Sequence, residues 1–140
     1  MFRKILLAYD GSEGANRALE AGIKLAQTHQ AELWALAVEE RLPRFSGTID
    51  EVKEEKEFAN RRYSKLMKTA QTRAKAAGVE LKTILRAGHA AQTIVEVAKE
   101  GGFDAVLVGH SGHSEVWAAF LGTTAEKVSR HAPCSVLIVR

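Results

Sequence analysis

The sequence is 140 residues long, with 46% hydrophobic residues, 26% charged residues and a formal net charge of +3. This length and balance are typical of one soluble domain with a single core, spanning residues 1–140. Basic residues are scattered among acidic ones and aromatics make up only 6%, which argues against nucleic-acid binding. No apolar run reaches the ~20 residues that cross a bilayer. Cys134 is the only cysteine, so we expect a cytoplasmic protein without internal disulfides.

Five short apolar runs predict five β-strands. Four of them are nearly continuous in Val, Ile, Leu and Ala, as strands buried on both faces of a parallel sheet are. The third alternates apolar and charged residues, which indicates an edge strand. Trp34, in the second run, and Cys134, before the last, are interpreted as core residues. In chain order the runs are Lys4 to Tyr9, Glu32 to Val38, Val79 to Leu85, Asp104 to Val108 and Ser135 to Val139.

Helical periodicity fills the intervals between these strands. A first helix is expected after the N-cap residue Ser12, a long one up to Gly78, a third up to Gly101 and a last one before Pro133. Alternating strands and helices predict an open parallel α/β sheet with helices on both faces. The segment from Glu39 to Gly47 shows no pattern and is expected to be a connection beside the ligand-binding edge.

The long helix is acidic in its first half and basic in its second. This polarity complements the helix macrodipole, so we interpret the charges as a solvated face. The basic residues are Arg61, Arg62, Lys65, Lys68, Arg73 and Lys75.

Two segments are the candidates for a ligand site. In an open α/β sheet, ligands bind beyond the carboxyl ends of the strands, where the winding order reverses. Asp10-Gly11-Ser12 follows the first strand, Gly109 to His113 follows the fourth, and Gly122-Thr123-Thr124 opens the last helix. Glycines that can take positive φ let the backbone approach a ligand, and unpaired amides at a helix start favour phosphate.

Structural explanations stand beside these roles. Thr123 and Glu126 have the spacing of a capping box, and Asp10 is a candidate for an Asx turn or a helix cap. His110 and His113 can donate hydrogen bonds to phosphate, lie in solvent or, given a third ligand, bind a metal. Neither a Walker loop nor a Rossmann fingerprint is present.

The glycine spacing resembles the ATP-binding signature of the universal stress protein family: glycine, two residues, glycine, nine residues, then Gly-Thr. Gly109, Gly112, Gly122 and Thr123 match it, and the run His131-Ala132-Pro133-Cys134 helps to extend the resemblance over the whole chain. The resemblance implies a five-stranded parallel sheet of order 3-2-1-4-5, of the adenine nucleotide alpha hydrolase-like class, and a frequent homodimer.

The resemblance also implies roles for single residues. Asp10 and the backbone at Val38 would face adenine and ribose, Gly109 would lie against the ribose, and the later glycines and threonines would surround the phosphates. The residues expected to bind ATP, ADP or AMP are Tyr9, Asp10, Gly11, Val38, Gly109, His110, Gly112, His113, Gly122, Thr123 and Thr124.

One stretch departs from the family pattern. Members that bind ATP often carry Arg or Lys between the second and third glycines, whereas His113 to Leu121 contains neither and includes Glu115. An acidic group near phosphate is repulsive. Three consequences stay open: the nucleotide binds weakly, AMP or ADP is preferred, or Mg²⁺ is needed for binding. Trp117 and Phe120, in the same stretch, are assigned either to the nucleotide or to a dimer contact.

These observations favour a nucleotide-binding regulatory or stress-response protein. A slow ATPase or phosphotransferase is the first alternative, for which Asp10 is the one strong catalytic candidate. A module that has kept the fold and lost the ligand is the second, supported by Glu115. The last strand is apolar on both faces and lies at an edge in the implied order, so we expect homodimers to pair through it.

Overall fold

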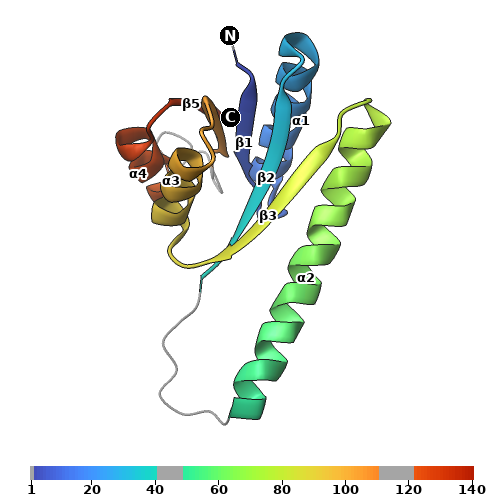
Figure 1. Ribbon diagram of the computed structural model, residues 1–140, viewed down its shortest axis with the longest axis vertical. Coiled ribbons are helices and arrows are strands. Elements are labelled where there is room, and N and C mark those ends of the chain that lie inside the picture. Colours follow the sequence, from blue (N-terminus) through green and yellow to red (C-terminus); the bar gives the residue numbers. More distant parts are fainter. Residues whose placement is uncertain (1, 41–48, 111–121) are drawn as a thin grey trace.

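The computed structural model describes residues 2–40, 49–110 and 122–140. Five strands and four helices alternate along them (Figure 1). The strands form one sheet in the order β3-β2-β1-β4-β5, and every pairing is parallel. This confirms the predicted fold class and strand order. The elements are β1 Lys4–Ala8, α1 Glu13–His29, β2 Glu32–Glu39, α2 Ile49–Ala76, β3 Leu81–Ala87, α3 Ala90–Glu100, β4 Ala105–Gly109, α4 Thr123–His131 and β5 Ser135–Val139.

Two hydrophobic layers cover the two faces of the sheet. Ile5 and Leu7 of β1 point into the layer formed with α1 and α2, whereas Leu6 points into the layer formed with α3 and α4. All three side chains are fully buried, as expected of the central strand of a parallel sheet. Figure 1 shows the two helix pairs on opposite sides of the sheet. The winding order reverses between β1 and β4, which places the switch point at their carboxyl ends.

The third strand begins two residues later than predicted because its first residues close helix α2. Gly78 has a φ of +76° and its amide donates to the Lys75 carbonyl, while the Val79 amide donates to the Ala74 carbonyl. These two bonds form a Schellman motif, and Val79 is buried as its hydrophobic contact. The strand then runs along the sheet edge, as predicted.

Helix α2 is seated on the sheet by its second half only. Met67, Ala70 and Ala74 are buried in the first layer, whereas Ile49 and Phe58 are 87% and 65% exposed. The long helix therefore extends past the carboxyl end of the sheet (Figure 1). None of the described helices is long and apolar enough to span a membrane.

Trp34 and Cys134 are only partly buried, which corrects the expectation that both are core residues. The Trp34 ring packs edge-on against Phe103, and the ammonium groups of Lys4 and Lys82 lie 5.3 and 5.1 Å from its centroid. Burial raises the pKa of the Cys134 thiol, and Asp104 raises it further. A raised pKa disfavours the reactive thiolate, in line with the structural role predicted for this cysteine.

Candidate functional site

A cleft of about 560 Å³ lies at the switch point, which is a size typical of small-molecule sites. We call it the switch-point cleft. Its floor is formed by the carboxyl ends of β1, β2 and β4, and its walls come from both helix layers. The described residues that line it are Ala8, Tyr9, Asp10, Ser12, Gly14, Ala15, Leu36, Val38, Glu40, Arg62, Tyr63, Ala90, Ile94, Val108, Gly109, Gly122, Thr123, Thr124 and Ala125.

The structure brings seven of the eleven predicted ligand residues together in this cleft. They are Tyr9, Asp10, Val38, Gly109, Gly122, Thr123 and Thr124. Gly11 and His110 are described but do not line it. Gly112 and His113 lie outside the described residues, as do Glu115, Trp117 and Phe120.

Helix α4 presents its N-terminus to the cleft without a side-chain cap. Gly122 is the N-cap residue, with φ −61° and ψ 151°, and as a glycine it offers no side-chain acceptor to the first amides of the helix. Thr123 and Thr124 are the first two helical residues, and both are exposed. Because Gly122 holds the N-cap position, the capping box predicted for Thr123 does not form; Glu126 instead pairs with Arg130 at 2.8 Å. The open amides and the helix dipole favour an anion here.

Asp10 forms the Asx turn that the sequence suggested. Its Oδ1 accepts a hydrogen bond of 2.9 Å from the Ser12 amide, and Ser12 Oγ in turn accepts from the Ala15 amide at 3.2 Å to cap α1. Gly11, between them, has a φ of +82°, and a Cβ there would lie 2.8 Å from Leu66 Cδ2. The positive φ of the turn therefore favours glycine at position 11, with Leu66 of α2 packed over it, whereas Asp10 is exposed on the cleft wall.

The sequence and the fold are both matched among known proteins. The sequence model of the universal stress protein family matches residues 1–140. This chain belongs to that family. It is 36% identical over 151 residues to the universal stress protein YxiE of Bacillus subtilis, and both chains are covered in full. The universal stress protein UspA from Lactobacillus plantarum superposes with a TM-score of 0.83 at 28% identity, over 99% of this chain and 98% of that one.

A further solved structure adds a ligand. A universal stress protein crystallised in complex with cAMP superposes with a TM-score of 0.77 at 27% identity. The match covers 99% of this chain and 97% of that one. A relative with the same fold as this chain therefore binds a cyclic adenine nucleotide.

Gly109 is a glycine for a different reason from the one predicted. Glycine can take positive φ, but neither Gly109 nor Gly122 does so in this structure. A Cβ on Gly109 would lie 2.4 Å from the carbonyl carbon and oxygen of Gly14. The close approach that Gly109 permits is thus between β4 and the first turn of α1, which form one edge of the cleft.

His110 lies in the interior instead of in solvent. Its side chain is only 5% exposed, its amide donates to the Val139 carbonyl at 2.7 Å, and its carbonyl accepts from Arg17 Nη2 at 3.4 Å. The Nε2 atom is buried and has no hydrogen-bond partner among the residues that the structure describes. Within residues 2–40, 49–110 and 122–140, no three His, Cys, Asp or Glu side chains gather to hold a metal.

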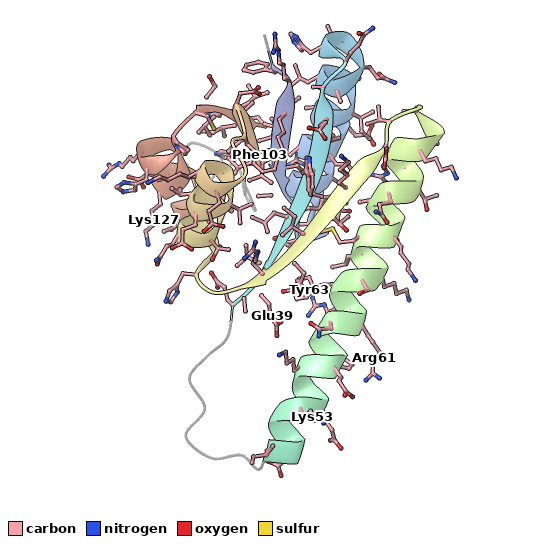
Figure 2. All side chains as sticks on the ribbon, in the orientation of Figure 1. Glu39, Lys53, Arg61, Tyr63, Phe103 and Lys127 are labelled. Carbon is pink, nitrogen blue, oxygen red and sulfur yellow. The ribbon has the colours of Figure 1, made fainter. Side chains whose placement is uncertain are left out.

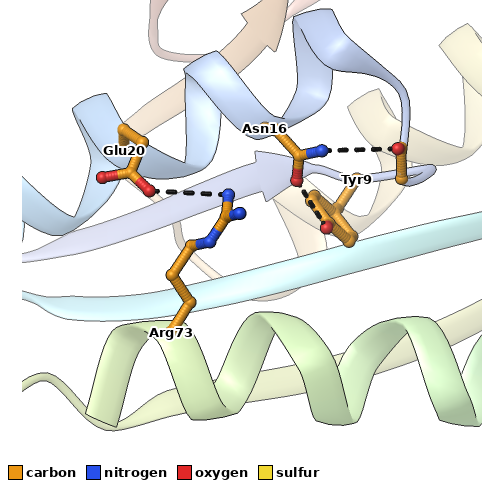
Figure 3. Close-up of polar contacts among 5 residues, drawn as sticks. Tyr9, Asn16, Glu20 and Arg73 are labelled. Atoms are coloured by element: carbon orange, nitrogen blue, oxygen red, sulfur yellow. Dashed lines mark hydrogen bonds and ion pairs between the residues drawn. The ribbon is translucent and has the colours of Figure 1, made fainter. Parts of the chain in front are cut away.

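Tyr9 joins the cleft floor to helix α1. Its hydroxyl donates to Asn16 Oδ1 at 2.7 Å, and Asn16 Nδ2 donates to the Gly11 carbonyl at 3.4 Å (Figure 3). Burial raises the pKa of Tyr9, against a smaller lowering by Arg73. The tyrosine therefore stays neutral and keeps its hydrogen bond over the physiological pH range.

Sequence reasoning missed the contributions of α2 and of the end of β2. Arg62 and Tyr63 line the cleft although the charges of α2 were assigned to a solvated face. Glu40 lines it too, and its Oε1 accepts from the Ala90 amide at the start of α3 at 3.2 Å. The length of the α2 pattern was the available signal, because a helix longer than the strands must pass beyond the end of the sheet.

A second hollow adjoins the cleft. This α3–α4 groove, of about 700 Å³, shares Glu40, Ala90, Thr123 and Thr124 with the switch-point cleft. It adds basic side chains from α4, Lys127 and His131, and His89 from the start of α3. Cationic groups therefore lie on both sides of the open N-terminus of α4.

Proposed function

We propose that this universal stress protein binds an adenine nucleotide, ATP, ADP or AMP, in the switch-point cleft. The main support is that three features line one cleft: the N-terminus of α4, where Gly122 offers no side-chain cap, the side chain of Asp10, and the end of β2. Phosphates would lie at the amides of Thr123 and Thr124. Adenine and ribose would lie between Val38 and Asp10. The relative crystallised with cAMP supports an adenine nucleotide as the ligand class.

A regulatory role, set by nucleotide occupancy, is the form of this function that we favour over rapid turnover. Asp10 and Glu40 are the carboxylates among the described lining residues, and each already accepts a backbone hydrogen bond. Asp10 is thereby committed to shaping the turn into α1. The location we propose is the cytoplasm, which rests on the lone cysteine at the sequence level.

A thermal-shift titration tests nucleotide binding. A ligand at a hundred times its Kd adds ~2.7 kcal/mol to the free energy of unfolding. For a domain of this size that raises Tm by roughly 9 °C. ATP, ADP and AMP are titrated to millimolar concentration, each with and without Mg²⁺, and GTP serves as the control for the base. No shift with any adenine nucleotide would refute the proposal.

We also propose a homodimer that pairs through β5. This strand is an edge of the sheet, and Leu137 is 45% exposed on it. An apolar edge strand without proline or inward charge is a template for pairing with a second copy. Light scattering at micromolar concentration is expected to give twice the chain mass, and Leu137→Glu is expected to give monomers. A monomeric wild-type protein would contradict this assembly.

A further inference from the structure

Of the charged side chains in the described lining of the switch-point cleft, one is favourable for binding a polyanion. Asp10 and Glu40 contribute two carboxylates to its described lining, and Arg62 contributes the one cationic side chain of that lining. The stretch from His113 to Leu121 holds neither Arg nor Lys. Among the described lining residues, a phosphate group would without Arg62 meet two negative charges and no positively charged side chain.

The packing of the second half of α2 brings the turn that carries Arg62 to the rim of the cleft. Met67, Ala70 and Ala74 are buried against the sheet, and Leu66 closes over Gly11. Further along the helix, Arg73 Nη1 lies 3.5 Å from Glu20 Oε1 on α1 (Figure 3). These contacts hold the second half of α2, and Arg62, one turn before Leu66, is exposed and lines the cleft.

The two neighbouring arginines of α2 have different surroundings. Arg62 and Tyr63 line the cleft, whereas Arg61 does not. Figure 2 shows Arg61 on the side of α2 that faces away from the sheet, and Tyr63 on the side towards it. No hydrogen bond or ion pair joins Arg62 to another residue of the described ranges. Its guanidinium is thus available to an incoming anion.

We propose that Arg62 is the side chain that recognises the phosphate charge of the bound nucleotide. This inference rests on the proposed nucleotide function and deepens it. A guanidinium suits the role because its planar fork can bind two phosphate oxygens at once and is more weakly hydrated than an ammonium group. Arg62 lines the cleft from the α1–α2 layer, and the first residues of α4 line it from the other layer. The phosphate group is held between the two layers, and the charge missing from residues 113–121 is supplied by α2.

Lys127 is the rival cation. It lies in the α3–α4 groove on the other side of Thr123 and Thr124 and does not line the switch-point cleft. If the phosphates turned into that groove, Lys127 and not Arg62 would control their binding. The two residues therefore make opposite predictions for the same measurement.

Isothermal titration of adenosine, AMP and ATP tests the inference on wild-type protein and four variants. Arg62→Gln removes the proposed cation and Arg62→Lys keeps its charge. Arg61→Gln is the matched control on the adjacent residue, and Lys127→Gln tests the rival. Arg62→Gln is expected to weaken ATP and AMP binding about 10- to 100-fold, as for loss of a charged hydrogen bond, and adenosine binding by less than about threefold. Arg62→Lys is expected to recover part of the loss, and Arg61→Gln and Lys127→Gln to change affinity less than about twofold.

The possible outcomes distinguish a failure of the Arg62 role from a failure of nucleotide binding itself. If wild-type protein binds nucleotides and Arg62→Gln behaves like Arg61→Gln, the role of Arg62 is refuted while nucleotide binding stands. An equal loss for adenosine and ATP, or a loss confined to Lys127→Gln, also refutes it. If wild-type protein binds no adenine nucleotide, the proposed function fails and this inference fails with it. Melting curves of all variants check that each change leaves the fold intact.

Discussion

Helices α1 and α4 both begin at the switch-point cleft, but they satisfy their first amides in different ways. Helix α1 begins on Ser12, whose hydroxyl accepts from the Ala15 amide, after a turn held by Asp10. Helix α4 begins on Gly122, which has no side chain to cap it. Capped amides are already paired, whereas uncapped ones need water or a ligand. The contrast indicates that α1 shapes the cleft and that α4 is the helix that meets the anion.

The largest expected effect comes from disturbing the seat of α1. Gly109→Ala places a Cβ 2.4 Å from backbone atoms of Gly14, in the first turn of α1. Since backbone cannot move aside as a side-chain tip can, we expect the free energy of unfolding to fall by about 2–3 kcal/mol. Urea denaturation measures the loss.

Gly78→Ala is the control for this variant. Gly78 has φ +76° but nothing within 4 Å of an added Cβ, so only backbone strain opposes the change. Its expected cost is about 1 kcal/mol. Equal costs at the two positions would show that the contact between Gly109 and α1 is less tight than described.

Converting α4 into a capped helix gives the next largest effect. Gly122→Asp supplies a carboxylate that can accept from the first amides of α4 and occupies the place proposed for phosphate. We expect ATP affinity to fall about tenfold or more, equivalent to ~1.4 kcal/mol, while Tm stays the same or rises. Gly122→Ala adds a side chain without a cap and is expected to lose less affinity. Unchanged ATP binding by Gly122→Asp would place the phosphates elsewhere.

Removing the cap of α1 tests the same contrast between the two helices from the side of α1. Ser12→Ala leaves the Ala15 amide without its side-chain acceptor, at a cost of about 1 kcal/mol in the free energy of unfolding. Thr123→Ala at the start of α4 removes a hydroxyl that caps nothing, and its expected cost is below about 0.5 kcal/mol. Parallel urea titrations compare the two, and equal losses would mean that α4 is capped by Thr123 in solution.

The smallest effect concerns Tyr9, which braces the first turn of α1 through Asn16. Burial raises the pKa of the Tyr9 hydroxyl above its ordinary value of about 10. The folded protein then holds this proton more tightly than the unfolded chain does. Stability from this group is full below about pH 10 and is lost as the pH rises beyond it.

Tyr9→Phe is expected to cost about 0.5–1 kcal/mol at neutral pH through the lost hydrogen bond, and to decline less steeply in alkali. Melting temperatures of both proteins at pH 8 and pH 10.5 measure the difference. Parallel declines would show that Tyr9 does not carry the alkaline sensitivity.

The fold was accessible from the sequence because its signals are local and repeated. Apolar runs such as Asp104 to Val108 can be stable only when buried on two faces, and the alternation with helices then requires parallel pairing. The strand order itself came from the family resemblance, and the structure confirms it. The ligand edge followed from the reversal of winding, and the cleft lies there.

The parts of the site that sequence did not predict depend on distances across the fold. Arg61 and Arg62 are neighbours in the same charged run and look alike in the sequence. Which of them lines the cleft depends on how α2 lies on the sheet. Gly109 looks like a ligand-loop glycine until Gly14 is found against it. Thr123 has the spacing of a capping box, but the helix begins one position earlier than that box requires.

The walls of the switch-point cleft belong to two different hydrophobic layers, with α2 on one side of the sheet and α4 on the other. A nucleotide held between Arg62 and the α4 amides would act as a crosslink over the end of the sheet. Its arrival would slow amide hydrogen exchange in both helices at once, although they lie on opposite faces. Such a crosslink gives the domain a way to convert the presence of a small molecule into a stiffening felt on both of its surfaces.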